Sequence, residues 1–280
     1  MYDLNLTTSY VPAQSDMDVR EITVGAMLRE IAEARPDSEA LKEIRQDGSP
    51  GRNWTYGELL AEAEKLARAL STRFAPGERV VVWSPNSPEW VLMEYACALA
   101  GLVLVTANPA FQVRELEYVL KQSGAVALFL VEEFRGNPMR SIGADVAAGI
   151  PAVREITDME SPALFAFGSR PVSMPQVAPG DAAMIQYTSG TTGFPKGAVL
   201  SHRGLVNNAR FYAQRCGVTA ATTWVNVMPM FHTSGCGMVT LGCLQAGCRM
   251  VLISLFDPEV VLDQLEACRA DIILGVPTMV

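Results

Sequence analysis

The chain has 280 residues, enough for one large domain or two modest ones, each with a substantial core. Its hydrophobic fraction of 49% and charged fraction of 19% are typical of a globular protein. The formal charge of -8 argues against a nucleic-acid-binding protein, which would present a basic stripe to phosphates. A nucleotide site is not excluded, because one loop and one lysine suffice to hold a triphosphate.

The cysteines and histidines point to an intracellular protein without a zinc site. Neither the six cysteines nor the two histidines follow zinc-ligand spacing. Most cysteines have apolar neighbours, which indicates reduced thiols in the core of a cytoplasmic protein. The amino terminus lacks the basic and apolar regions of a signal peptide.

Residues 216–248 contain no Asp, Glu, Lys or Arg, which raises the question of a membrane span. Asn226, Pro229 and His232 interrupt the stretch, whereas a spanning helix needs about 20 continuous apolar residues. We therefore expect buried core lining a site and no transmembrane segment, while peripheral contact with a membrane stays open.

The first half of the chain alternates helical and strand patterns. Thr55 and Glu58 occupy the positions of a capping box ahead of an amphipathic stretch. Ser87 and Pro88 begin a second helix. The βαβαβ order predicts a parallel sheet covered by helices on both faces. The expected strands are 79–83, 102–106 and 125–131, and the expected helices are 59–74, a helix from Pro88, and 114–122.

Between about residues 132 and 180 the pattern weakens and prolines punctuate it, so we expect a connector. Alternation then resumes, and the chain ends on a strand exit and a helix start, as a truncated domain would. We predict an α/β fold of two βαβ-type subdomains, about 1–178 with the connector and about 179–280. The expected later strands are 184–187, 198–201, 224–228, 249–254 and 271–275, and the helices are 203–216, 235–246 and 258–268.

The densest chemical signal is the segment 187–197, Tyr-Thr-Ser-Gly-Thr-Thr-Gly-Phe-Pro-Lys-Gly. Its glycines let the backbone turn so that N–H groups converge on an anion. Its hydroxyls add donors to phosphate oxygens and an oxygen ligand for magnesium, and its lysine adds a positive charge. The segment therefore predicts a polyphosphate site, whose candidate ligands are Thr188, Ser189, Gly190, Thr191, Thr192, Gly193 and Lys196.

A Walker P-loop, and with it a P-loop ATPase or kinase, is the nearest functional alternative. Pro195 stands where that loop needs glycine, and Gly197 follows the lysine where Ser or Thr should stand. The next residues, 198–201, resemble a strand rather than the start of a helix. A plain Ser/Thr/Gly-rich hairpin is the other interpretation, and so ordered a pattern disfavours it.

The segment matches, at every fixed position, the Y-T-S-G-T-T-G-x-P-K-G signature of the adenylate-forming ligases, which include acyl-CoA synthetases, luciferases and peptide-synthetase adenylation domains. The chain resembles this family from about residue 25, and its motifs look most like those of fatty-acyl-CoA synthetases. The resemblance implies the incomplete N-terminal domain of the ligase fold, without the C-terminal lid domain. Further similar segments are 108–111, 115–118, 123–124, 229–235 and 275–278.

This resemblance implies an enzyme that joins a carboxylate to the α-phosphate of ATP, releases pyrophosphate and passes the acyl group from acyl-AMP to coenzyme A. The loop would hold the β- and γ-phosphates, and Thr188 would help place Mg²⁺. The family's adenine-binding segment, its Y-G-x-T-E motif, its ribose-binding Asp and its C-terminal catalytic Lys have no counterpart in these residues. We therefore assign no catalytic residue and expect the chain alone to be inactive.

The family's next motif, at 229–235, would border the acid and the adenylate. Its candidate pocket residues are Phe231, His232, Thr233, Ser234 and Gly235. We interpret His232 as pocket lining rather than a general base, and His202 as structural. Amino-acid-activating relatives carry an Asp in this motif, whereas residues 216–248 offer no partner to an ammonium. A fatty or aryl acid with an uncharged tail is favoured.

Two functions from other classes fit the same motifs. A non-catalytic nucleotide-binding module would use the fold and the loop without running a reaction. A luciferase-like oxygenase would share every motif found in these residues.

Overall fold

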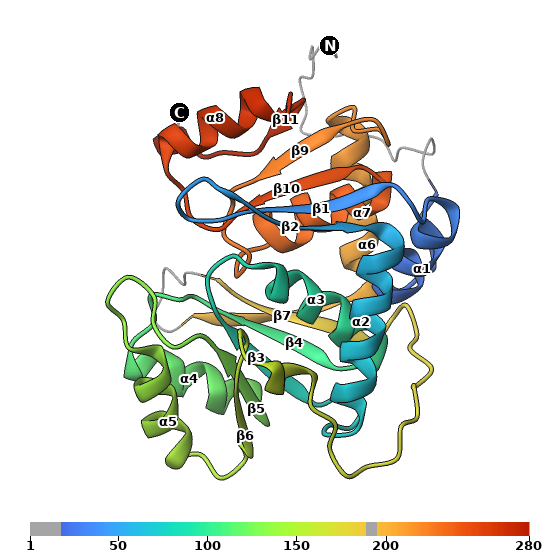
Figure 1. Cartoon of the computed structure of the whole chain (residues 1–280). Helices are drawn as coiled ribbons and strands as arrows, with labels where there is room; N and C mark the ends of the chain where they lie inside the picture. The colour runs from blue at the N-terminus through green and yellow to red at the C-terminus, as the bar shows by residue number, and fades with distance from the viewer. Residues whose placement is uncertain (1–17, 189–194, 280) are drawn as a thin grey trace, which may run out of the picture.

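The computed structural model describes residues 18–188 and 195–279, which form two stacked β-sheets with helices around and between them (Figure 1). The larger sheet has the strand order β6-β5-β3-β4-β7-β8, and the smaller has the order β11-β9-β10-β1-β2. The strands are β1 (Glu39–Ile44), β2 (Pro50–Thr55), β3 (Arg79–Trp83), β4 (Val103–Ala107), β5 (Ala127–Leu130), β6 (Glu155–Asp158), β7 (Ala182–Thr188), β8 (Lys196–Ser201), β9 (Thr223–Asn226), β10 (Arg249–Ile253) and β11 (Ile272–Ile273).

Several of the α-helices begin at a capping side chain. Thr55 accepts the Glu58 N–H and Ser87 accepts the Trp90 N–H, so the predicted capping box and cap are both confirmed. Asp257 caps the last helix in the same way. The helices are α1 (Val24–Ala34), α2 (Tyr56–Ser71), α3 (Pro88–Ala100), α4 (Val113–Ser123), α5 (Met139–Ala148), α6 (His202–Arg215), α7 (Leu241–Ala246) and α8 (Pro258–Ala267).

The core of the larger sheet is parallel, as predicted. Val81 of β3 pairs with Val105 of β4 on one side and Leu128 of β5 on the other. Strands buried on both faces are continuous apolar runs, which is why the sequence revealed them. Each sheet also ends in one antiparallel pair, β7 with β8 and β1 with β2. The central strands are therefore parallel as predicted, and the antiparallel end pairs make both sheets mixed.

The two sheets do not divide the chain near residue 178, as the expected subdomain boundary would require. Strands β1 and β2, from the start of the chain, complete the smaller sheet, where Leu41–Ile44 pair with Met250–Ile253. Strands β7 and β8, which border the phosphate loop, belong to the larger sheet. Pairing between segments that are distant in the chain decides which strand belongs to which sheet, and local sequence patterns do not predict it.

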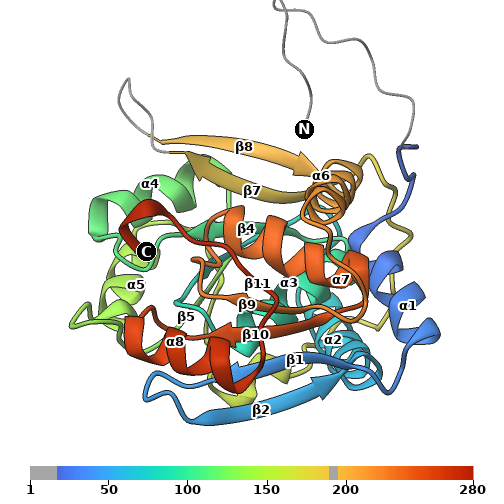
Figure 2. The ribbon, with the colours of Figure 1, turned by 90° about the horizontal axis from the view of Figure 1, so that it is seen from above.

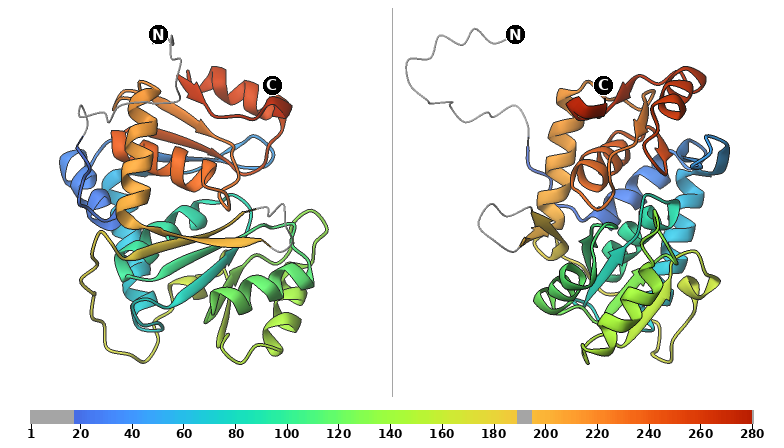
Figure 3. Two further views of the ribbon diagram at one scale, coloured as in Figure 1. Left: turned by 180° about the vertical axis from the view of Figure 1, so that it is seen from behind. Right: turned by 90° about the vertical axis from the view of Figure 1, so that its left-hand side faces the viewer.

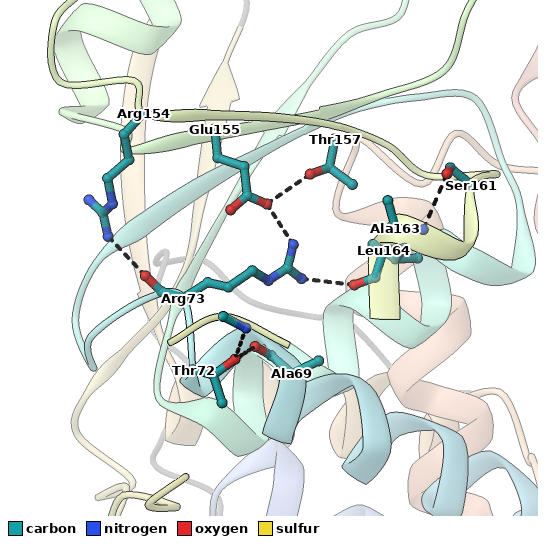
Figure 4. A network of polar contacts seen from close by, with 10 residues as sticks. Ala69, Thr72, Arg73, Arg154, Glu155, Thr157, Ser161, Ala163 and Leu164 are labelled. Carbon is teal, nitrogen blue, oxygen red and sulfur yellow. Dashed lines mark hydrogen bonds and ion pairs between the residues drawn. The ribbon is translucent and has the colours of Figure 1, made fainter. Parts of the chain in front are cut away.

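The region expected to be a connector contains ordered structure, namely α5, β6 and a short 3₁₀-helix, η1 (Pro162–Phe165). Figure 4 shows how Arg73, just after α2, links β6 and η1 to the end of that helix. Its guanidinium donates to the Glu155 carboxylate at 2.6 Å and to the Leu164 carbonyl at 2.8 Å. Thr157 donates to the same carboxylate at 2.8 Å. The prolines misled the sequence interpretation because they lie between these short elements or at their starts, as Pro138 and Pro162 do.

Helices cover both faces of each sheet. Gly143 of α5 packs against Leu128 and Leu130, whereas Phe129, on the opposite face, meets Phe74 edge-on at 6.2 Å between ring centroids. Helices α2 and α3 lie between the two sheets (Figure 1). On the smaller sheet, Val251 and Ile253 pack with Val261 of α8, while the alternate residues Met250 and Leu252 face the main core.

Helix α6 spans both layers. Seen from behind, it runs from the smaller sheet to the β7–β8 hairpin of the larger one (Figure 3). Its Tyr212 ring stacks on Trp224 of β9 at 6.0 Å between centroids. The helix thereby fixes the hairpin relative to the smaller sheet.

Candidate functional site at the ends of β4 and β7

A cavity of about 460 Å³ opens where the carboxyl ends of β4 and β7 meet the segment that follows β9. Ligands of α/β proteins commonly bind outside the carboxyl ends of parallel strands. None of the described residues that line it is acidic. They are Thr106, Asn108, Phe111, Gln186, Tyr187, Thr188, Pro195, Ala198, Leu200, Phe231, His232 and Thr233.

The phosphate-loop segment joins the antiparallel strands β7 and β8. Thr188 is the last residue of β7 and pairs with Lys196, the first residue of β8. The Thr188 hydroxyl donates a long hydrogen bond, 3.4 Å, to the Lys196 carbonyl oxygen. Both residues are exposed. The predicted phosphate ligands Ser189, Gly190, Thr191, Thr192 and Gly193 lie outside the described residues.

A strand follows the lysine, as the sequence predicted when a Walker loop was disfavoured. A Walker lysine would instead stand at the start of a helix.

Helix α4 contacts the turn end of this hairpin. From above, it lies beside the end where β7 stops and β8 begins (Figure 2). The Tyr118 hydroxyl donates to the Pro195 carbonyl at 3.0 Å, and its ring meets that of Tyr187 edge-on at 6.3 Å. Burial, with a smaller contribution from Tyr118, raises the pKa of Tyr187 to about 12. Tyr187 is therefore a neutral packing group at physiological pH.

Phe231, His232 and Thr233 line the cavity, whereas Ser234 and Gly235 are buried behind them. The sequence predicted all five as pocket residues, and the structure divides them into lining and support. A side chain on Gly235 would collide with the Pro229 carbonyl oxygen and lie 2.7 Å from that of Met228. Only glycine fits this close backbone approach.

The helix expected over 235–246 begins as a π-helix, η2 (Ser234–Thr240), and continues as α7. Single π-turns inside helices frequently occur at functional sites. Here the wider turn starts directly after the cavity-lining residues.

His232 is exposed, and its hydrogen bonds define its tautomer. The Ser234 N–H donates to Nδ1 at 3.1 Å, and the Ser234 hydroxyl lies 2.9 Å from the same atom. Because Nδ1 accepts from a backbone N–H, the ring proton resides on Nε2. His232 is therefore a hydrogen-bond donor at the cavity wall.

The floor of the cavity includes Gln186, which sequence reasoning did not single out. Its amide Nε2 donates to the sulfur atoms of Met184 at 3.0 Å and Cys236 at 3.1 Å. A polar residue within the apolar strand β7, two positions before Thr188, was the available signal. The pair Cys236–Gln186 joins the π-helix to the strand that leads into the phosphate loop.

His202 is fully buried at the start of α6. Its Nδ1 accepts the Val24 N–H at 3.4 Å. Burial, opposed by the nearby Asp181, lowers the pKa of His202 to about 4. It does not line the cavity.

Two further features bear on the environment of the protein. All six cysteines are free thiols, and five of them are buried. Among residues 18–188 and 195–279, no helix combines the length and apolar character that crossing a bilayer requires.

Comparison with known proteins gives a consistent picture. The family described as AMP-binding enzyme matches residues 28–280. The mitochondrial medium-chain acyl-CoA ligase ACSF2 of Homo sapiens is 32% identical over 305 residues, which cover 97% of this chain and 49% of that protein. The chain thus spans about half the length of the curated relatives it matches.

Solved structures agree with this match. The long-chain-fatty-acid-CoA ligase FadD1 of Archaeoglobus fulgidus superimposes with a TM-score of 0.85 at 25% identity, over 97% of this chain and 55% of that one. The N-terminal domain of FACL13 from Mycobacterium tuberculosis gives 0.79 at 26%, over 93% and 64%. The fold is that of the N-terminal domain of the adenylate-forming ligases, and the chain belongs to the AMP-binding enzyme family, as its phosphate-loop sequence indicated.

Proposed function

We propose that the whole protein carrying this chain adenylates a carboxylic acid with ATP and Mg²⁺ and passes the acyl group to coenzyme A. The observation that carries this proposal is the cavity itself. It joins Thr188 and Pro195, at the two ends of the phosphate loop, to Phe231, His232 and Thr233. The relatives named acyl-CoA ligases support the same reaction class.

In the first step, a carboxylate oxygen would attack the α-phosphorus of ATP while the bond to the bridging oxygen breaks and pyrophosphate leaves. Both reactants are anions, so catalysis consists mainly of charge neutralisation and alignment. Lys196 is exposed at the end of the hairpin, and no acidic residue of the described part of the chain forms an ion pair with it. Its ammonium is therefore available to the β- and γ-phosphates, together with the loop 188–193.

Thr188 is the residue that fits a magnesium ion. Its hydroxyl is exposed and donates only the long hydrogen bond to the Lys196 carbonyl, which leaves its oxygen lone pairs open. Mg²⁺ prefers oxygen ligands and, when bound, would neutralise phosphate charge. The hydroxyl would hold the ion beside the phosphates.

The residues that line the cavity indicate which class of carboxylic acid it would accept. Phe111, Leu200 and Phe231 present apolar groups, and no lining carboxylate could pair with a substrate ammonium. We propose a fatty acid of medium to long chain, or an aryl acid, as the substrate.

Acid-dependent ATP–pyrophosphate exchange by the whole protein tests the proposal. We expect exchange with octanoate, palmitate or benzoate and none with α-amino acids, and AMP release once coenzyme A is added. Preferred turnover of an amino acid would contradict the substrate assignment. ATP binding without exchange on any acid would instead favour a non-catalytic nucleotide-binding module.

The 280-residue chain alone should give little or no exchange, because the relatives it matches are about twice as long. Exchange by the chain at the rate of the whole protein would refute this expectation.

A further inference from the structure

Asn86 connects the two sheets at the level of the candidate site. It lies in the loop between β3 and α3, on the larger sheet, and the residue is buried. Its amide nitrogen donates to the Met228 carbonyl at 3.0 Å and to the Ile253 carbonyl at 3.3 Å. Its amide oxygen accepts the Met230 N–H at 2.8 Å. All three backbone partners follow or end strands of the smaller sheet.

The backbone that Asn86 holds leads directly into the lining residues 231–233. A second buried amide, that of Asn226, forms hydrogen bonds to the same stretch of backbone. Its oxygen accepts the Met228 N–H at 3.2 Å, and its nitrogen donates to the Gly235 carbonyl at 3.3 Å. Donor and acceptor groups of residues 228, 230 and 235 are thus committed to two asparagines, so the lining segment has one backbone position.

The larger sheet carries the other half of the cavity. Trp83, at the end of β3, pairs with Ala107 and donates its indole N–H to the Asn108 carbonyl at 2.8 Å. Strand β4 in turn pairs with β7, which ends at Thr188. The loop bearing Asn86 is therefore in register with the strands that end at the phosphate loop.

We infer that Asn86 is a positioning residue that sets where the acid-binding segment 231–233 stands relative to the phosphate loop. It does not line the cavity and acts through the backbone of Met228 and Met230. The expected effect of Asn86 on acid binding rests on the proposed function, whereas its expected effect on the backbone of 227–231 does not.

Two variants and a matched control test the inference in the whole protein. Asn86→Ala removes all three hydrogen bonds. Asn86→Asp keeps an acceptor for the Met230 N–H but gives up the amide donor. Ser84→Ala is the control, because Ser84 is buried in the same loop and its hydroxyl donates only to Pro85 of that loop.

Hydrogen–deuterium exchange of a peptide covering 227–231 provides the first readout. In Asn86→Ala we expect exchange there to accelerate about tenfold, the effect of one lost hydrogen bond, with β4 unchanged. Asn86→Asp should retain slow exchange at Met230, and Ser84→Ala should match the wild type. Unchanged exchange in Asn86→Ala would overturn the inference, whatever the protein catalyses.

The second readout is kinetic. Asn86→Ala should raise the KM for the acid about fivefold and leave the KM for ATP within about twofold, because only the acid segment is released. An equal rise of both KM values, or the same rise in Ser84→Ala, would show a general structural role instead. Absence of activity in the wild-type protein would count against the proposed function, while the exchange readout would still decide the role of Asn86.

Discussion

At the scale of single residues, exposure separates side chains that are free to meet a ligand from side chains buried outside the candidate site. Lys196 and His232 are exposed at the cavity or its edge, whereas His202 is fully buried. The only two histidines of the chain therefore differ in role: His232 can meet a ligand and His202 is part of the core. Their environments lead to separate expectations.

Lys196→Ala should weaken the binding of Mg-ATP to the whole protein about 10- to 100-fold, since a hydrogen bond to a charged group contributes about 1.5–3 kcal/mol. Isothermal titration calorimetry would measure it. Lys121→Ala is the control, because that ammonium pairs with Glu117 on α4 at 2.5 Å and lies outside the cavity. Equal affinities of the Lys196 variant and the wild type would remove the lysine from the phosphate site.

His202 makes stability depend on pH. Burial lowers the pKa of His202 from 6.5 to about 4. Between these pH values, His202 therefore binds a proton in the unfolded chain but not in the folded chain. The contribution of His202 to stability is therefore complete above pH 6.5 and falls by up to about 3 kcal/mol as the pH drops toward 4.

Urea unfolding of the wild type and of His202→Gln at several pH values measures this effect. The wild type should lose stability relative to the variant between pH 6.5 and 4. A difference that stays constant across this range would contradict the assignment and point to a solvated histidine.

At the scale of elements, short structures that lack a strong pattern are held by buried polar contacts. Arg73 anchors β6 and η1, as Figure 4 shows, and its side chain is 9% exposed. Burial lowers the pKa of Arg73, against the attraction of Glu155. The π-helix η2 depends similarly on a local constraint, the close approach of Gly235 to the backbone of 228–229.

Arg73→Met should destabilise the chain by about 3 kcal/mol, because it leaves the Glu155 carboxylate without its partner in a partly buried site. Thermal or denaturant unfolding would measure the loss. Arg154→Ala is the control: its pair with Glu78 is more exposed, and such pairs contribute about 0–1 kcal/mol. The double variant Arg73→Met/Glu155→Gln should recover part of the loss. Equal effects of the Arg73 and Arg154 changes would refute the argument from burial.

At the scale of the whole molecule, the sheets interleave early and late parts of the chain. The Tyr56 hydroxyl also joins an early segment to a late one, since it lies within hydrogen-bonding distance of the Cys243 carbonyl, 3.1 Å, and of the Cys248 carbonyl, 2.7 Å. Strand β10 is flanked by β1 on one side and β9 on the other. The cavity consequently draws its two halves from different sheets.

A fragment comprising residues 179–280 should not fold alone. It would lack β1, leaving Met250–Ile253 with one unpaired edge, and its β7–β8 hairpin would have lost β4. Circular dichroism and NMR shift dispersion would measure the result, with the 280-residue chain as reference. A cooperative unfolding transition in the fragment would contradict this interpretation.

Much of the fold could be predicted because many elements are strongly patterned. The strand 79–83 coincides with β3, and the Thr55–Glu58 box marks the start of α2. Strands β1 and β2 were not predicted, because both mix polar and apolar positions and β1 gains stability from pairing with the distant strand β10. For the site, the motifs led to Phe231, His232 and Thr233. The only local signal for Gln186 was a polar residue within an apolar strand, and Asn86 carried none.

The sequence by itself determined the family, because spacing along one short segment defines its motif. It also determined the caps and the buried strands, which depend on near neighbours. Only the tertiary structure decided which strands share a sheet, which motif residues line the cavity and which residues support them. Those outcomes arise from contacts between segments more than 100 residues apart, such as Asn86 with Met228 and Leu41 with Met250, and such contacts leave no mark on local periodicity.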